Sequence, residues 1–119
     1  MASVILVVED DVDVREMLEF AFRSSGFKVV VASDGNAALA AIEKQRPCLV
    51  ILDLIMPRMS GWQMMAELKA RNADIPVCVI SALETKVPEG AVASFMKPFD
   101  VKELVAVAAR YCAHSNVAA

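Results

Sequence analysis

The residues best suited to chemistry in this sequence are carboxylates that closely follow short apolar runs. A serine and a lysine occupy similar positions. The set consists of Glu9, Asp10, Asp11, Asp53, Ser81 and Lys97. Two like charges about 4 Å apart repel by roughly 4 kcal/mol at a surface-like dielectric, so carboxylates gather only where cations compensate them. Lys97 supplies one positive charge, and a divalent cation is expected to supply the rest. Hard oxygen ligands with no histidine or cysteine beside them favour Mg²⁺.

Asp53 is the acid whose position most needs an explanation. It closes the apolar run Cys48–Leu52 and is followed by three more apolar residues. Burying a carboxylate there is costly without a partner, which indicates a functional role. Asp11 and Asp13 are different, because a helix is expected to begin beside them and either could simply cap it. For these two acids the choice between cap and ligand stays open.

Five apolar runs alternate with helical patterns and must position these side chains. Each run has the length of a strand, and the segments between them carry apolar residues at helical spacing. The runs are Val4–Val8, Lys28–Ala32, Cys48–Leu52, Val77–Ile80 and Ala93–Met96. Such alternation predicts an α/β fold, a doubly wound parallel sheet with helices on both faces. In a sheet of this kind functional groups collect at the carboxyl ends of the strands, where the winding direction reverses.

The expected helices carry cap signals and apolar inner faces. Asp13 with Glu16 looks like the capping box of the first helix, Ser60 with Gln63 that of the third, and Asp100 with Glu103 that of the last. The second helix follows Ser33–Gly35 and stops before Pro47. Expected inward residues are Val14, Met17, Leu18, Ala21 and Phe22 in the first helix, Met64, Met65 and Leu68 in the third, and Leu104, Val107, Ala108 and Tyr111 in the last.

The segment between Ser81 and Lys97 is short for what it must contain. It has to supply two loops, a helix and the fifth strand, and Pro88 and Gly90 lie in its middle. Both residues disfavour a helix interior. We therefore expect a fourth helix that is short or absent.

Composition excludes several classes of protein. The chain has 119 residues, which fits one domain over 1–119, with 113–119 expected to fray. No apolar run is long enough for a membrane span, and no signal peptide is evident. A net charge of −3 argues against nucleic acid as a direct partner. The three cysteines match no metal motif, so we expect them to be reduced and mostly buried, as in a cytoplasmic protein.

The motifs taken together resemble the receiver domains of two-component response regulators. The motifs are Val7–Asp11, Asp53–Pro57 with Met59 and Gly61, Ser81-Ala82 and Lys97–Phe99. Each motif is weak alone, but their order on these strand ends is specific, and the resemblance covers nearly the whole chain. It implies a five-stranded, flavodoxin-like sheet in the order 2-1-3-4-5.

The resemblance also implies a role for each site residue. Asp53 would be the phosphoacceptor, with Ser81 as the switch hydroxyl and Lys97 as the family's lysine. Glu9 and Asp10 would bind Mg²⁺, together with the Asp53 carboxylate and the backbone carbonyl of Ile55. The Lys97–Pro98 peptide bond is expected to be cis. Such a module is not a conventional enzyme, although it catalyses its own phosphorylation and slow dephosphorylation.

Three positions depart from the family pattern. The rotating aromatic residue of the family falls at Ser94, so its coupling to Ser81 is in doubt, and the neighbouring Phe95 is interpreted as core. Ile55 and Leu83 occupy the places where polar residues could align a hydrolytic water. Because both are apolar, we expect a long-lived phosphorylated state.

Other functions fit the residues less well. A haloacid-dehalogenase-like phosphatase would need a second aspartate where Ile55 stands. A flavodoxin-like nucleotide binder would need a phosphate loop after the first strand, where this chain has acids. A receiver-like scaffold or phosphate sink without a switch output remains the alternative. The expected phosphodonor is a sensor histidine kinase or a histidine phosphotransfer protein. With no effector domain after the last helix, output is expected through another protein.

Overall fold

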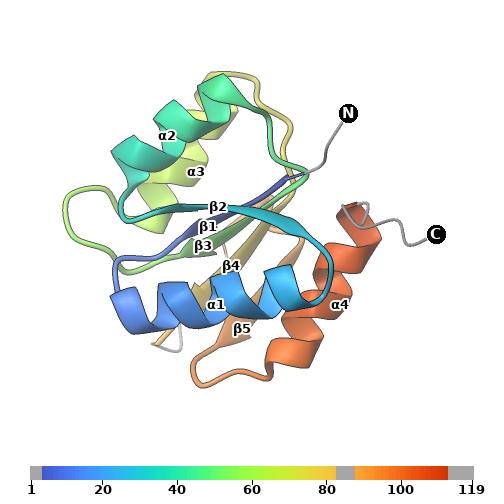
Figure 1. Cartoon of the computed structure of the whole chain (residues 1–119). Helices are drawn as coiled ribbons and strands as arrows, with labels where there is room; N and C mark the ends of the chain where they lie inside the picture. Colours follow the sequence, from blue (N-terminus) through green and yellow to red (C-terminus); the bar gives the residue numbers. More distant parts are fainter. Residues whose placement is uncertain (1–3, 83–87, 113–119) are drawn as a thin grey trace.

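The sheet of this protein has five parallel strands, and its order reverses beside the first strand. The computed structural model describes residues 4–82 and 88–112 (Figure 1). The strand order is β2-β1-β3-β4-β5, as the sequence predicts. The strands are β1 (Val4–Val8), β2 (Lys28–Ala32), β3 (Leu49–Asp53), β4 (Val77–Ser81) and β5 (Ala93–Met96).

Helices cover both faces of the sheet, as Figure 1 shows, with α1 and α4 on one side and α2 and α3 on the other. They are α1 (Val12–Ser24), α2 (Gly35–Lys44), α3 (Gly61–Ala70) and α4 (Val101–Tyr111). Two apolar cores result. One joins α1 and α4 to the sheet through Leu18, Phe22 and Leu104. The other joins α2 and α3 to it through Leu39 and Met64. The central strands β1, β3 and β4 are buried along their whole length, which explains their unbroken apolar runs.

The segment between β4 and β5 contains no helix in its described part, residues 82 and 88–92. The prediction of a short or absent fourth helix is therefore confirmed there, and residues 83–87 lie outside the described residues. The label α4 belongs to the last helix of the chain. On β5, Phe95 packs against the first core and Ser94 is exposed, as expected from their alternation. The expected fraying of 113–119 also falls outside the described residues.

The cap of α1 corrects one expectation. Asp11, not Asp13, is the N-cap, and its carboxylate accepts the backbone N–H groups of Asp13 and Val14. Several acids in succession offer the same cap pattern, so the sequence did not distinguish them. The caps at Ser60 and Asp100 lie where they were expected. The second helix begins at Gly35, within the segment expected to precede it, and Asp34 caps it.

Two helix faces are also less buried than predicted. Met17 on α1 and Tyr111 on α4 are each 42% exposed, because they lie at the margins of the inner faces. No helix among residues 4–82 and 88–112 is both long and apolar enough to span a bilayer.

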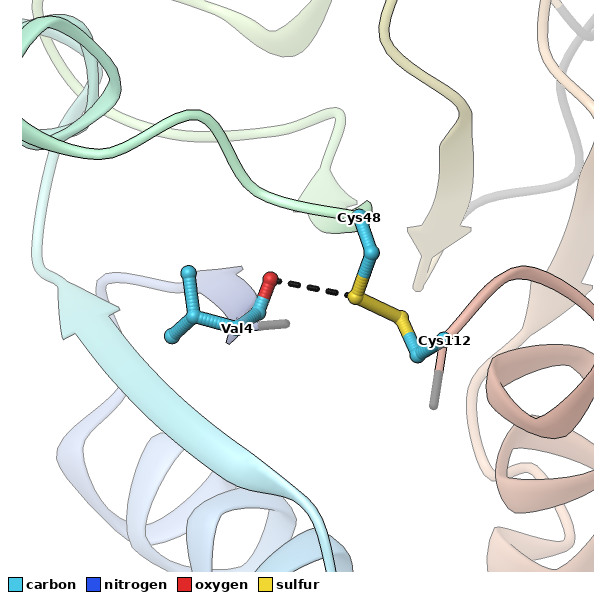
Figure 2. The surroundings of a disulfide bond; sticks show 3 residues. All are labelled: Val4, Cys48 and Cys112. Atoms are coloured by element: carbon cyan, nitrogen blue, oxygen red, sulfur yellow. Dashed lines mark hydrogen bonds between the residues drawn. A yellow bond between two sulfur atoms is a disulfide. The ribbon is translucent and has the colours of Figure 1, made fainter. Parts of the chain in front are cut away.

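The cysteines contradict the expectation of three reduced thiols. Cys48 and Cys112 form a disulfide across 64 residues of sequence (Figure 2). Cys78 is a buried free thiol. The bond joins the residue before β3 to the residue that caps α4. No sequence spacing announces such a pair, because only the folded chain brings the two residues together.

Candidate functional site

The predicted site residues meet at the carboxyl edge of the sheet. Glu9 directly follows β1 and donates its backbone N–H to Ala32 at the end of β2. Asp53 and Ser81 are the last residues of β3 and β4. Lys97 directly follows β5 and donates its backbone N–H to the Ser81 carbonyl at 2.7 Å. Four neighbouring strands thus place these side chains together, as the rule for doubly wound sheets predicts.

Burial makes this cluster energetically demanding. Glu9 is fully buried, Asp53 is 3% exposed and Ser81 is 5% exposed. The Lys97 ammonium lies 2.7 Å from Glu9 Oε1 and 3.5 Å from Asp53 Oδ2. One lysine therefore compensates two buried carboxylates, which leaves room for further positive charge.

The pKa values reflect this excess of negative charge. Burial, then hydrogen bonding to Asp53, raises the pKa of Glu9 to about 7, although the contact with Lys97 opposes the rise. For Lys97, burial lowers the pKa, but the hydrogen bond to Glu9 and the charge of Asp53 outweigh it, so its pKa is raised. Without further cations, Glu9 therefore binds a proton more readily than an ordinary glutamate does.

Three carboxylates can converge on one cation. Glu9, Asp10 and Asp53 each offer an oxygen, and these oxygens lie within 4.8 Å of one another. Asp10 is exposed, so the cluster opens to solvent on its side. An all-oxygen donor set of this kind fits Mg²⁺ or another hard divalent ion.

The loop after β3 orients the Asp53 carboxylate. Its Oδ1 accepts the backbone N–H of Ile55 at 3.2 Å, while Oδ2 faces Lys97. Gly61 donates its backbone N–H to the Leu54 carbonyl at 2.9 Å. A Cβ atom at Gly61 would lie 2.7 Å from Leu54 Cα and 2.8 Å from the Asp53 carbonyl oxygen. Only glycine allows this close return of the chain.

The structure adds one residue near the site that the sequence did not predict, and it confirms one predicted detail of the backbone. Arg15 on α1 donates from its guanidinium to the Glu9 carbonyl at 3.0 Å, which ties α1 to the loop that carries the acids. An arginine among the acids at the start of a helix was the available signal. The Lys97–Pro98 bond is cis, as expected.

Comparison with known proteins agrees with this geometry. Residues 5–109 match the family of response regulator receiver domains. This chain belongs to that family. The receiver domain therefore belongs to two-component signal transduction, and the resemblance to receiver domains seen in its sequence motifs is confirmed.

Curated relatives of this receiver domain are longer than the chain. The transcriptional regulatory protein PrrA of Mycobacterium tuberculosis is 41% identical over 108 residues, which cover 86% of this chain and 46% of that protein. The DNA-binding response regulator MtrA of the same organism is 40% identical over 112 residues, covering 89% and 49%. The receiver domain therefore spans about half the length of the curated relatives it matches.

Solved structures give the same fold. The receiver domain of NtrX from Brucella abortus is 36% identical, with a TM-score of 0.82, over 90% of this chain and 96% of that one. The response regulator TrrA from Thermotoga maritima, solved in complex with Mg²⁺ and BeF, is 26% identical. Its TM-score is 0.82 over 92% of this chain and 98% of that one.

Proposed function

We propose that this receiver domain accepts a phosphoryl group on Asp53 from the phosphohistidine of a sensor histidine kinase or a histidine phosphotransfer protein. The single observation that carries the proposal is a nearly buried carboxylate at a strand end, held between a lysine and two further acids. A structural acid would be expected to have one partner and no excess of negative charge around it. An Asp53 oxygen would form a bond to phosphorus as the bond from phosphorus to the histidine nitrogen breaks.

Mg²⁺ is part of this proposal. Glu9, Asp10 and Asp53 would bind it through carboxylate oxygens, and the Ile55 carbonyl would complete the protein's share of the ligands. Their oxygen-only chemistry and mutual distances support this assignment. When bound, the ion would neutralise oxygens of the transferring phosphoryl group. The relative TrrA, solved with Mg²⁺ and BeF, adds support by analogy.

Lys97 and Ser81 would act on the phosphoryl group from the other side. Lys97 lies 3.5 Å from Asp53 Oδ2, close enough for its ammonium to meet an oxygen of the incoming group. Ser81 ends the neighbouring strand, and its hydroxyl would bond another phosphoryl oxygen. Because the Lys97 backbone is hydrogen-bonded to Ser81, movement of one would be passed to the other.

The phosphorylated state would be long-lived and would change the binding of another protein. Ile55 is 45% exposed beside Asp53, and its apolar side chain cannot orient a water for hydrolysis. Leu83, the second such position, lies outside the described residues. Direct binding of nucleic acid by this module is not part of the proposal, although MtrA is named a DNA-binding regulator. A cytoplasmic location is part of it, because histidine kinases draw on cytoplasmic ATP. The cysteines do not support that location, because Cys48 and Cys112 form a disulfide.

A phosphate sink without a coupled output is the second candidate. It is favoured by Ser94, which is exposed where the family has its rotating aromatic residue, and by Met96, which is 54% exposed on the same strand. In such a sink the phosphorylated domain would bind its partners no differently.

Phosphoryl uptake and output can be tested together. Wild type should be labelled by acetyl phosphate in Mg²⁺ but not in EDTA, and Asp53→Asn should not be labelled although it folds. Asp10→Ala should need more Mg²⁺. Hydrogen exchange of the β4–β5 region with and without phosphorylation then separates a switch from a sink. Stoichiometric labelling of folded Asp53→Asn would overturn the proposal.

A further inference from the structure

The disulfide lies on the opposite edge of the sheet from the phosphoacceptor. Cys48 precedes β3, whose other end is Asp53, and its backbone N–H donates to Val4 at the start of β1. Cys112 caps α4, and its Cα lies 5.4 Å from that of Cys48. The chemistry of this pair is therefore separate from that of the acid cluster.

The surroundings of the pair suit a disulfide and also suit two thiols. Cys48 Sγ lies 3.3 Å from the Val4 carbonyl oxygen, the contact dashed in Figure 2. In the disulfide this sulfur carries no hydrogen, so the contact there is only a close approach. In the dithiol, the S–H group of Cys48 would find this acceptor already in place. Opening the bond therefore leaves no unsatisfied polar group at Cys48.

Cys112 is equally compatible with both states. It is 7% exposed and packs in the core beneath α1 and α4. A free cysteine behaves as a small apolar side chain in such a place. Its backbone N–H donates to the Ala108 carbonyl at 2.8 Å, a bond that does not depend on the disulfide. The last turn of α4 therefore keeps this hydrogen bond when the sulfurs separate.

The three cysteines differ in solvent exposure, and this difference decides which sulfur an external thiolate can attack. Cys48 is half-buried and the more accessible of the pair, so an external thiolate would attack there and expel Cys112. Cys78 is fully buried on β4, and burial raises the pKa of its thiol to about 12. It would remain a thiol and take no part.

We propose that Cys48 and Cys112 form a reversible redox site that opens and closes by thiol–disulfide exchange with a glutathione-type thiol. In opening, an external thiolate bonds to Cys48 Sγ, and the bond to Cys112 breaks. A second external thiol then attacks the mixed disulfide and releases Cys48. One protein disulfide is reduced to two thiols while two external thiols are oxidised to a disulfide, and closing is the reverse.

Closing this bond would fix the end of α4 to the amino edge of the sheet. The helix begins four residues after Lys97, whose backbone is held by Ser81, so the disulfide secures its far end. With the bond open, the packing of Val107, Ala108 and Cys112 in the core would hold the end of α4 without a covalent link. The redox state would thus control local opening of this helix end.

A redox titration of the native protein tests the site without any substitution. The protein is equilibrated in glutathione buffers of graded ratio from both the reduced and the oxidised side, and thiols are then trapped by alkylation and mapped by mass spectrometry. Cys48 and Cys112 should lose alkylation together, with the same midpoint from both directions. Circular dichroism should stay native, and Cys78 should react only after denaturation.

Two further readouts sharpen the test. Cys112→Ser should carry glutathione on Cys48 under oxidising conditions, whereas Cys78→Ala should titrate like wild type. Amides of Val107–Cys112 should exchange more slowly in the oxidised protein. Absence of the Cys48–Cys112 peptide at every ratio would overturn the proposal, and so would a bond that opens only in denaturant. Neither result depends on phosphoryl uptake by Asp53.

Discussion

The buried Glu9 should make the metal-free protein less stable as the pH rises. Its pKa is raised from 4.5 to about 7 in the fold, chiefly by burial, so the folded state binds a proton more tightly than the unfolded chain. Stability from this proton is complete below pH 4.5 and is lost as the pH rises towards 7. At about 1.4 kcal/mol for each pH unit, the loss amounts to about 3 kcal/mol, most of it between roughly pH 5 and 8.

Urea unfolding in EDTA at several pH values measures this loss. Glu9→Gln keeps the size of the side chain but cannot titrate, so its free energy of unfolding should change much less over this range. Lys97, whose pKa is raised, stays charged throughout and adds no pH dependence. His114 is common to both proteins, so the difference between them isolates Glu9.

The matched control is Glu16→Gln. Glu16 is an exposed acid on α1, so this variant should follow wild type. If Glu9→Gln lost stability with rising pH as steeply as wild type, the reasoning about burial of Glu9 would be refuted.

Three further predictions concern the β3 loop and the disulfide. Gly61→Ala should lower the free energy of unfolding by roughly 1–3 kcal/mol in urea titrations, because the new methyl group would meet the Leu54 backbone. An unchanged midpoint would contradict this. Ile55→Asn should speed loss of phosphate from the labelled protein, measured as decay after acetyl phosphate is removed, whereas equal or slower decay would count against a water-excluding role. Reduction of the Cys48–Cys112 bond should cost up to about 4 kcal/mol of unfolding free energy, given a separation of 64 residues; equal urea midpoints with and without reductant would argue that the link contributes nothing.

The sequence predicts most of the architecture because the type of each strand and helix follows from the spacing of apolar residues within it. Apolar runs such as Val4–Val8 have the length and the β-branched composition of strands buried on both faces, and their alternation with helices predicts a parallel sheet. Because functional groups collect at the carboxyl ends of the strands in such a sheet, Glu9, Asp53 and Lys97 are predicted to lie close together. The short segment before β5 was predictable by counting residues against Pro88 and Gly90.

The errors have physical causes as well. The Cys48–Cys112 pair depends on how α4 ends over the amino edge of the sheet, and no local pattern encodes that approach. Asp13 was predicted to cap α1, but Asp11 is the cap. The prediction was wrong because neighbouring acids look alike in a sequence pattern. The extent to which Glu9 is buried, and hence its raised pKa, follows from packing of the whole site.

The most direct test of the central claim is to locate the phosphoryl group itself. Protein phosphorylated by acetyl phosphate in Mg²⁺ is reduced with borohydride, which converts an aspartyl phosphate to homoserine, and the peptides are mapped by mass spectrometry. The expected result is homoserine at the position of Asp53 alone, in an amount that falls to background in EDTA. Conversion at Asp10 or Asp11, or none in a folded and Mg²⁺-saturated protein, would contradict it.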